Sequence, residues 1–367
     1  MLLIDNAVTA EVLRMPDVVR VLDRAYRELA DGTTICRPRI DLRYPVGDGE
    51  QAYQFGTMEG GSAASGYHAI RMKSDVLTEV EYGGTRTQEK HCVEPGRYCG
   101  LVLLLSTRTG EPLAMLHDGV LQHMRVGADS AIGTDLAARA DARVLGMLGS
   151  GGMARVHLEA LLAVRPLERV QVYSPTRANR ERYAAGMGER FGLEVVAVDE
   201  PRDVFRGADV VMGCTDAAAD VVVGDWLEPG THVTSIGGRP DARAQERFDV
   251  WLRLGTVPAP LQDPTWRPTD EYLAYRAVPS DPVWDLHRHG SGRKPPSGDG
   301  GPRVVTFEEV LRGAPVRTSP EQITFSERGN VQGAQFFAVA GLVYELARER
   351  GLGRELPTEW FLQDIRD

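Results

Sequence analysis

The feature that most constrains this chain is the glycine-rich run Gly149-Ser-Gly-Gly-Met-Ala154. Residues 143–148 before it form a mostly apolar run with the length of a buried strand, and apolar residues after it recur at helical spacing. A strand, a glycine turn and a helix form the setting in which a dinucleotide pyrophosphate binds free N–H groups at a helix start. Gly149 allows the tight turn, Gly151 lets the backbone approach the pyrophosphate, and Ala154 permits close helix packing. The run therefore predicts a Rossmann domain, and a glycine turn of another α/β fold is the alternative.

Strand-like and helix-like segments alternate over about 110 residues beyond residue 140, which predicts a parallel sheet covered by helices. The expected strands are Arg143–Leu148, Val170–Ser174, Glu194–Val198, Ala208–Cys214, His232–Ile236 and Asp249–Leu252.

The first part of the chain has a different pattern. It combines an amphipathic helix over 17–29 with alternating, strand-like stretches, which indicates an antiparallel α+β unit. A long helix over 329–350 closes the chain. The expected fold class is α/β, with a doubly wound, mainly parallel Rossmann domain inserted into an α+β substrate-binding and dimerisation domain. The expected boundaries are 121–315 for the Rossmann domain, with a mobile loop at 288–303, and 1–120 plus 316–367 for the other domain.

Composition narrows the function classes. A length of 367 residues suits two domains, and a net charge of −10 argues against a nucleic-acid partner. No apolar run approaches the ~20 residues of a membrane span, and the first residues lack a signal-peptide pattern, so the expected address is the cytoplasm. His91, Cys92 and Cys99 do not have a common zinc spacing, so we expect no metal site and interpret them as solvated loop residues.

The residues after the second expected strand bear on cofactor choice. NAD sites usually present Asp or Glu there for the ribose hydroxyls, whereas this chain has Ser174, Thr176 and Arg177. Hydroxyls and an arginine suit a 2′-phosphate, so NADP(H) is favoured and NAD(H) stays open. The alternative is that Arg177 is a solvated residue of the first helical turn. The full set of expected cofactor-binding residues is Gly149, Gly151, Gly152, Met153, Ala154, Ser174, Thr176, Arg177, Cys214, Thr215, Gly237 and Gly238.

Several short motifs together resemble the ornithine cyclodeaminase/mu-crystallin family over nearly the whole chain. They are Pro38-Arg39, Met58, Lys73, Thr109-Gly-Glu-Pro112, Arg125-Val-Gly-Ala-Asp-Ser130, the glycine run, Gly237-Gly238 and Arg317-Thr-Ser-Pro-Glu-Gln-Ile-Thr324.

The resemblance implies a homodimer that binds a small amino or imino acid against the nicotinamide. It also implies that the substrate carboxylate is held by a set that maps to Arg39, Lys73 and Arg125. Guanidinium groups bind a carboxylate in a bidentate manner, and lysine adds a point charge. Read without the resemblance, each of the three is an ordinary surface charge. Lys73 is also a candidate proton donor or acceptor, with water and Asp75 as rivals.

Three positions depart from the family pattern. Gly56 stands where ornithine cyclodeaminases carry a glutamate, and Gly238 or Arg239 stands where they carry an aspartate. Val126 replaces the usual threonine after the arginine. Because the two carboxylates would bind the side-chain amine of ornithine, their loss argues against strict ornithine cyclisation.

The resulting expectation is an NAD(P)H-dependent oxidoreductase that reduces an imine (a ketimine) or dehydrogenates an amino acid. The first alternative is a cyclodeaminase, an ammonia-lyase that recycles NAD. The second is a non-catalytic protein that binds NADP(H) or a small ligand. Phe336 and Gln332 of the last helix are expected to line the substrate pocket, and 263–289 has two interpretations, a lid or extra interface wall and plain surface elaboration.

Overall fold

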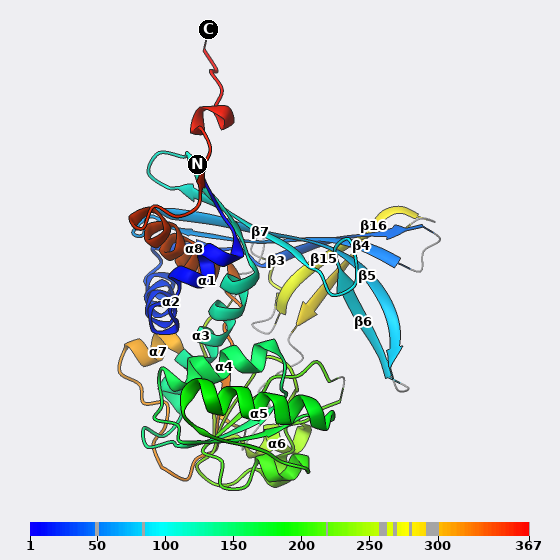
Figure 1. Cartoon of the computed structure of the whole chain (residues 1–367), viewed down its shortest axis with the longest axis vertical. Coiled ribbons are helices and arrows are strands. Elements are labelled where there is room, and N and C mark those ends of the chain that lie inside the picture. The colour runs from blue at the N-terminus through cyan, green and yellow to red at the C-terminus, as the bar shows by residue number, and fades with distance from the viewer. Residues whose placement is uncertain are drawn as a thin grey trace.

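Two sheets and the helices between them make up the molecule (Figure 1). The structure is a computed structural model. It describes residues 1–47, 51–82, 85–217, 219–256, 263–266, 270–278, 281–290 and 301–366. The loop expected at 288–303 lies outside the described residues from 291 to 300.

The first sheet is mostly antiparallel and has the order β16-β15-β3-β4-β5-β7-β8-β1-β19, with β2 paired to β4 and β6 paired to β5. Its strands are β1 (Leu2–Ile4), β2 (Thr34–Cys36), β3 (Arg39–Val46), β4 (Gln51–Ser62), β5 (Tyr67–Tyr82), β6 (Thr85–His91), β7 (Cys99–Ser106), β8 (Pro112–His117), β15 (Asp270–Val278), β16 (Asp281–Gly290) and β19 (Arg354–Glu355). Strands β15 and β16 come from the segment that the sequence left between a lid and surface elaboration. They extend the first sheet beside β3.

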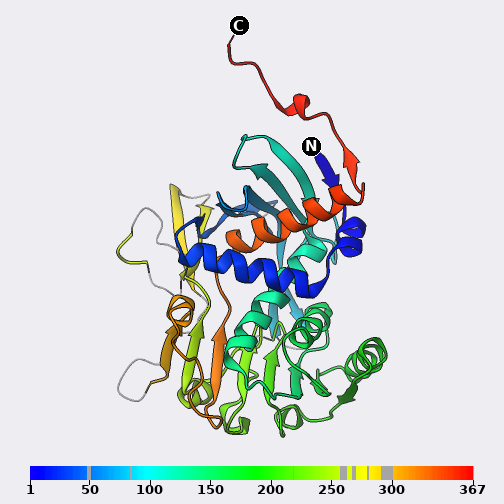
Figure 2. The same cartoon turned by 90° about the vertical axis from the view of Figure 1, so that its left-hand side faces the viewer.

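Three helices lie on one side of this sheet: α1 (Asn6–Val12), α2 (Met15–Ala30) and α8 (Gln332–Glu349) (Figure 2). Helix α2 points Val18, Leu22 and Ala25 into the core at helical spacing, as the sequence predicts. Helix α8 can approach β4 closely because Gly333 faces Gly60, where an added side chain would collide with backbone. These helices and one face of the sheet therefore enclose the first core.

The second sheet is parallel throughout and has the order β11-β10-β9-β12-β13-β18-β14-β17. Its strands are β9 (Val144–Leu148), β10 (Arg169–Tyr173), β11 (Glu194–Ala197), β12 (Val210–Gly213), β13 (His232–Ser235), β14 (Val250–Arg253), β17 (Arg303–Thr306) and β18 (Thr324–Glu327). Its helices are α4 (Gly152–Leu162), α5 (Arg177–Phe191), α6 (Ala242–Arg247) and α7 (Phe307–Leu311). The six strands expected from the sequence are present within one residue of their expected ends, apart from β12, which starts two residues later than expected. Strands β17 and β18 complete the sheet.

Helix α3 (Gly119–Ala137) joins β8 of the first sheet to the strand β9 that leads into the glycine loop. Residues 126–134 of this helix are mostly small, and all of them are buried. A helix that is buried on nearly all sides has no polar stripe facing solvent. A side chain at Gly127 would press against Val156 of α4, and one at Gly133 would press against Ser326 of β18. Small residues therefore let α3 pack tightly between the two sheets.

Within the described part of the chain, no helix combines the length and the apolar character that a membrane span requires.

Candidate active site

The glycine loop begins where β9 ends, at the carboxyl edge of the parallel sheet. Gly149 has φ +119°, and a Cβ on it would collide with the carbonyl oxygen of Cys214. Gly151 is the N-cap of α4, has extended backbone, and has no protein atom within 4 Å of where its Cβ would lie. Ala154 is fully buried and its carbonyl accepts a hydrogen bond from Tyr183 at 3.1 Å. Gly149 is thus required by the fold itself, whereas nothing in the protein requires a glycine at 151.

A hollow of about 620 Å³, the glycine-loop hollow, opens above this turn. It is lined by Gly149, Ser150, Gly151, Gly152, Met153, Ser174, Pro175, Thr176, Asn179, Cys214, Thr215, Asp216, Ile236 and Gly237. Nine of the twelve expected cofactor residues are among them, and Ala154, Arg177 and Gly238 are not. Ligands of open parallel sheets bind at this edge, so the hollow has the location and chemistry of a dinucleotide site.

Arg177 and Arg180, at the start of α5, differ in their surroundings. Arg177 is exposed and forms an ion pair with Glu181 at 2.7 Å. Arg180 is buried, binds the carbonyl of Ser174 at 3.0 Å and pairs with Asp199 at 2.7 Å. Arg180 therefore holds the loop after β10 in place, while Arg177 reaches into solvent beside the hollow.

Lys73 is the centre of a row of residues that crosses four strands of the first sheet. Asp41 on β3 lies opposite Gly56, Gly56 on β4 lies opposite Lys73, and Lys73 on β5 lies opposite Gly100 of β7. Directly opposite residues share a face of the sheet. We call Asp41, Gly56, Lys73 and Gly100 the Lys73 row.

The two glycines of the Lys73 row make room for carboxylates. A Cβ on Gly56 would collide with the carboxylate of Asp41 and lie 2.7 Å from Cε of Lys73. A Cβ on Gly100 would collide with the carboxylate of Asp118. The space that a side chain at position 56 would occupy therefore contains the carboxylate of Asp41, from the neighbouring strand β3.

Acidic partners hold the basic side chains of this face. Asp41 binds Arg39 through two contacts, at 2.6 and 2.9 Å. Asp75 accepts a hydrogen bond from Nζ of Lys73 at 3.1 Å. Burial, with the neighbouring Arg39 guanidinium, lowers the pKa of Lys73 to about 8, so the amine exchanges its proton near neutral pH.

Arg125 is buried on α3 and is oriented by amide side chains. It donates to Oε1 of Gln122 at 2.8 and 3.2 Å and to Oε1 of Gln335, and its guanidinium lies 4.9 Å from the ring centre of Phe336. Phe336 also contacts Arg71, whose guanidinium pairs with Asp118 at 2.6 Å. The sequence predicted that Phe336 and Gln332 line the pocket. In the structure Phe336 lies beside Arg125, and the glutamine that binds Arg125 is Gln335.

Behind Arg125 lies a buried polar chain. Gln335 donates to the hydroxyl of Tyr26 at 2.6 Å, and Tyr26 donates to Asp129 on the next turn of α3. Burial raises the pKa of Asp129 to about 6, and its second oxygen has no hydrogen-bond partner among the described residues. These hydrogen bonds, made by residues of helices α2, α3 and α8, hold the guanidinium of Arg125 in place.

Arg328, which follows β18, links the two parts of the site electrostatically. Burial, and after it the charge of Arg328, lowers the pKa of Arg125. The same charge makes a smaller contribution than burial to the pKa of His157 and of Cys214 beside the glycine-loop hollow. The Nε of Arg328 is buried and has no hydrogen-bond partner among the described residues. The positive charge of Arg328 thus reaches both buried Arg125 and residues beside the glycine-loop hollow.

Replacing Gly56 by alanine tests how tightly this face is packed. The new methyl group would displace the Asp41 carboxylate and the Lys73 stem, so we expect the free energy of unfolding to fall by about 1–3 kcal/mol. Urea denaturation measures that change. The control is Gly186→Ala on α5, where the nearest atom to the new Cβ is 3.6 Å away, and an equal loss in both variants would contradict the packing argument.

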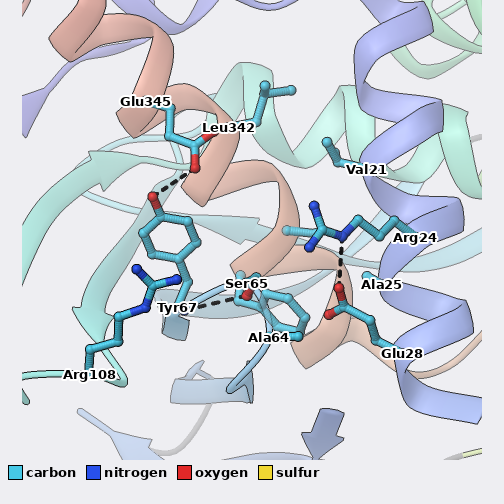
Figure 3. A pocket seen from close by; sticks show the side chains of 12 residues that line it. Val21, Arg24, Ala25, Glu28, Ala64, Ser65, Tyr67, Arg108, Leu342 and Glu345 are labelled. Carbon is cyan, nitrogen blue, oxygen red and sulfur yellow. Dashed lines mark hydrogen bonds and ion pairs between the residues drawn. The ribbon is translucent and has the colours of Figure 1, made fainter. Parts of the chain in front are cut away.

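A second hollow, of about 290 Å³, lies between α2, α8 and the turn after β4 (Figure 3). Its polar groups pair with one another: Arg24 binds Glu28 at 2.8 Å, and the hydroxyl of Tyr67 donates to Glu345 at 2.8 Å. None of the expected site residues lines it.

Sequence reasoning missed Asp41, Gln335, Arg71 and Tyr26 as members of the site. A signal was present for two of them. Alternate residues of a strand share a face, so Arg39 implies Asp41, and Lys73 implies Arg71. Tyr26 and Gln335 reach the site by helix packing, for which a single sequence carries no signal. No group of three metal-binding side chains occurs among the residues that the structure describes.

Comparison with known proteins adds three findings. The family model "Ornithine cyclodeaminase/mu-crystallin family" matches residues 70–257. A putative dehydrogenase of Rhizobium meliloti is 30% identical over 64% of this chain and 66% of its own length. A Delta(1)-pyrroline-2-carboxylate reductase of Bacillus cereus is 34% identical over 38% of this chain and 42% of its own length. The matches thus span about two thirds of the first relative and less than half of the second.

A solved structure resembles nearly the whole molecule. The Delta(1)-pyrroline-2-carboxylate reductase of Thermococcus litoralis, in complex with NADH and L-proline, aligns with a TM-score of 0.70 at 22% identity. The alignment covers 97% of this chain and 100% of that one. This likeness shows a common fold, with a parallel dinucleotide-type sheet joined to a second sheet.

Proposed function

Because the chain belongs to the ornithine cyclodeaminase/mu-crystallin family, we propose that it is an NAD(P)H-dependent oxidoreductase of small imino or amino acids. The reaction is reduction of a C=N bond, or the reverse oxidation of the amino acid. Two observations in one chain carry the proposal: a glycine-loop hollow at the edge of a parallel sheet, and a buried, cation-rich face of the other sheet. The reductase names of two similar proteins support it.

The nicotinamide supplies the hydride, and the protein supplies orientation and charge. We assign the dinucleotide to the glycine loop, Ser174 and Thr176, since these line the hollow. Arg39, Lys73 and Arg125 would hold the substrate carboxylate, each kept in position by Asp41, Asp75 or Gln335. As the hydride reaches carbon, the imine nitrogen gains a proton, and we assign that proton to Nζ of Lys73. Its pKa of about 8 suits transfer in either direction.

A cyclodeaminase is the second candidate, and one observation favours it. The Asp41 carboxylate occupies the space beside Gly56, so an acidic group lies near Lys73, and a second ammonium group would share it with Arg39. In that reaction the amino acid is oxidised, the imine cyclises, ammonia leaves, and the hydride returns to carbon. The cofactor is then recycled.

One set of assays separates these functions. Purified protein is incubated with L-ornithine and catalytic NAD while ammonia and proline are measured. In parallel, oxidation of NADPH or NADH is followed with a cyclic imino acid, with pyruvate plus amine, and with glyoxylate plus amine. Consumption of reduced cofactor with an imine, and no ammonia from ornithine, is the expected result. Ammonia and proline without net cofactor consumption would establish the cyclodeaminase, and tight cofactor binding without turnover would establish a binding protein.

For the cofactor we propose NADP(H) over NAD(H), on the basis of Thr176 and the exposed Arg177 beside the hollow. Reversing the charge with Arg177→Glu should raise the KM for NADPH about tenfold, which equals ~1.4 kcal/mol of lost binding. The KM for NADH should change less than about twofold, because NADH has no 2′-phosphate. Arg182→Glu, on the same helix and also exposed, is the matched control. Equal effects on both cofactors would refute the assignment.

We also propose a cytoplasmic homodimer. Its chain divides at about residue 120, as the sequence suggested, and again after β18, which pairs within the parallel sheet beyond the boundary expected at 315. The dimer is supported by the sheet face that α1, α2 and α8 leave uncovered (Figure 1). Leu101, Leu103 and Met115 point from that face and are partly exposed. Apolar surface of this extent on a sheet is typical of a contact between subunits.

A further inference from the structure

The last described segment of the chain, residues 357–366, extends away from the molecule beyond the edge of the first sheet (Figures 1 and 2). We call it the arm. Its apolar side chains are strongly exposed: Trp360 by 69%, Phe361 by 48%, Leu362 by 57% and Ile365 by 84%. Large apolar groups clustered in this way mark an interaction site. Trp in particular is enriched among the residues that dominate binding energy in interfaces.

The base of the arm is anchored, so the direction in which it leaves is set by the fold. Strand β19 pairs with β1 in antiparallel fashion. The N-terminal ammonium group of Met1 then donates to the carbonyl of Leu356 at 2.9 Å and to the hydroxyl of Thr358 at 2.7 Å. The amide of Leu356 donates back to the carbonyl of Met1 at 2.8 Å. These bonds carry the chain past the start of β1 and off the sheet edge.

A receptive surface lies on the outward face of the same sheet, on the side that the helices leave uncovered. A hollow of about 500 Å³ beside β1 opens from this face and reaches Val8 of α1. Its lining includes Leu3, Leu101 and Met115, together with Arg354 and His117. The arm of the same chain runs away from it. The arm leaves the sheet at Met1, at the start of β1. The hollow extends toward Ile4 and Asp5 at the other end of β1, so the arm points away from it.

We propose that the arm packs on the outward sheet face of a second copy of this chain, where its apolar residues cover the face that includes this hollow. The inference rests on the homodimer proposed above. In a two-fold dimer both subunits contribute the same surface to the interface. If the outward sheet faces form that interface, each arm starts beside it and can reach the face of the other copy. Charge complementarity favours the same occupant, since Glu359 and Asp364 of the arm would meet Arg354 and His117.

Photo-crosslinking tests the contact directly. p-Benzoylphenylalanine is introduced in place of Trp360 in the full chain, and the purified protein is irradiated. We expect an adduct of twice the chain mass whose crosslinked peptide comes from β1, β7 or β8. The control carries the same residue in place of Val304, which is 38% exposed on the edge strand β17 of the other sheet, and should give no such adduct. A crosslink within one chain, or none, would overturn the proposal.

Sedimentation equilibrium separates failure of the arm from failure of the dimer. Full-length protein is compared with a chain ending at Leu356 and with a full-length Trp360→Ser, Phe361→Ser variant. We expect the dimer dissociation constant to rise at least about tenfold in both, whereas Gln363→Ala leaves it unchanged. Equal dimerisation in all four proteins would refute the arm and leave the homodimer standing. A monomeric full-length chain would refute both, and the imine-reduction assay would still judge the chemistry independently.

Discussion

Replacing Lys73 by methionine is expected to lower kcat/KM for imine reduction by on the order of a thousandfold. Methionine keeps most of the buried side-chain volume but removes both the charge and the proton that we assign to the reaction. The fall in kcat is expected because the proton moves only in the transition state. A rise in KM is expected because the positive charge that binds the substrate carboxylate is lost. Steady-state kinetics with the imine found active in the assays measures the change. Cofactor affinity should stay within about twofold, since Lys73 does not line the glycine-loop hollow.

The pH profile tells a proton donor from a point charge. The pKa of Lys73 lies near 8, so the amine is protonated below that pH and neutral above it. In the reduction direction kcat should therefore fall as pH rises through about 8, and in the oxidation direction it should rise over the same range. Lys73→Arg keeps the charge at every pH, so it should retain substrate binding, lose most of kcat and lose the limb near pH 8. Full activity of Lys73→Arg would refute the donor assignment, because arginine does not release its proton in this range.

Replacing Gly151 by valine is expected to abolish cofactor binding while leaving the fold nearly as stable. The backbone at Gly151 is extended, a conformation that any residue adopts, and no protein atom lies near the position of its Cβ. A side chain there would project into the glycine-loop hollow, where we place the pyrophosphate. The dissociation constant for NADPH or NADH should rise at least about a hundredfold, the loss of ~2.7 kcal/mol. The melting temperature without cofactor should fall by no more than a few degrees, because valine is a poorer N-cap than glycine but meets no protein atom.

Titration of nicotinamide fluorescence gives the affinities, and thermal unfolding gives the stability. The matched control is Gly186→Ala, which lies on α5 away from the hollow. It should leave the affinity unchanged and should not lower the melting temperature, because alanine favours a helix over glycine. Gly149→Ala is the contrasting variant: its Cβ would collide with the carbonyl of Cys214, so it should lower the melting temperature as well. Unchanged cofactor affinity in Gly151→Val would show that the dinucleotide does not cross this loop and would remove the basis of the proposed function.

Prediction from the sequence succeeded where the signal is local. The glycine loop is readable because a strand, a turn with positive φ and a helix start occur within about a dozen consecutive residues. Six strands of the parallel sheet are readable because each is a short apolar run between helical segments. Strands β17 and β18 were missed, since the first is cut off from its neighbours by 257–302 and the second follows an irregular stretch. Strand β15 was missed for a related reason, because its partner β3 lies more than two hundred residues earlier.

The sequence by itself determined the α/β class, the dinucleotide loop and the identity of three candidate anchors, Arg39, Lys73 and Arg125. From the sequence, Gly56 indicated only that the glutamate of ornithine cyclodeaminases is absent at this position. Only the tertiary structure decided that Asp41 occupies the space beside that glycine, because the register of β3 on β4 brings the two residues opposite each other. It likewise decided that Gln335 holds Arg125, because α8 returns to α3 after the whole parallel sheet has been built. The physical reason is the same in both cases. Backbone turns and periodicity are set by neighbouring residues, whereas the partners of a buried charge are set by how distant strands and helices pack.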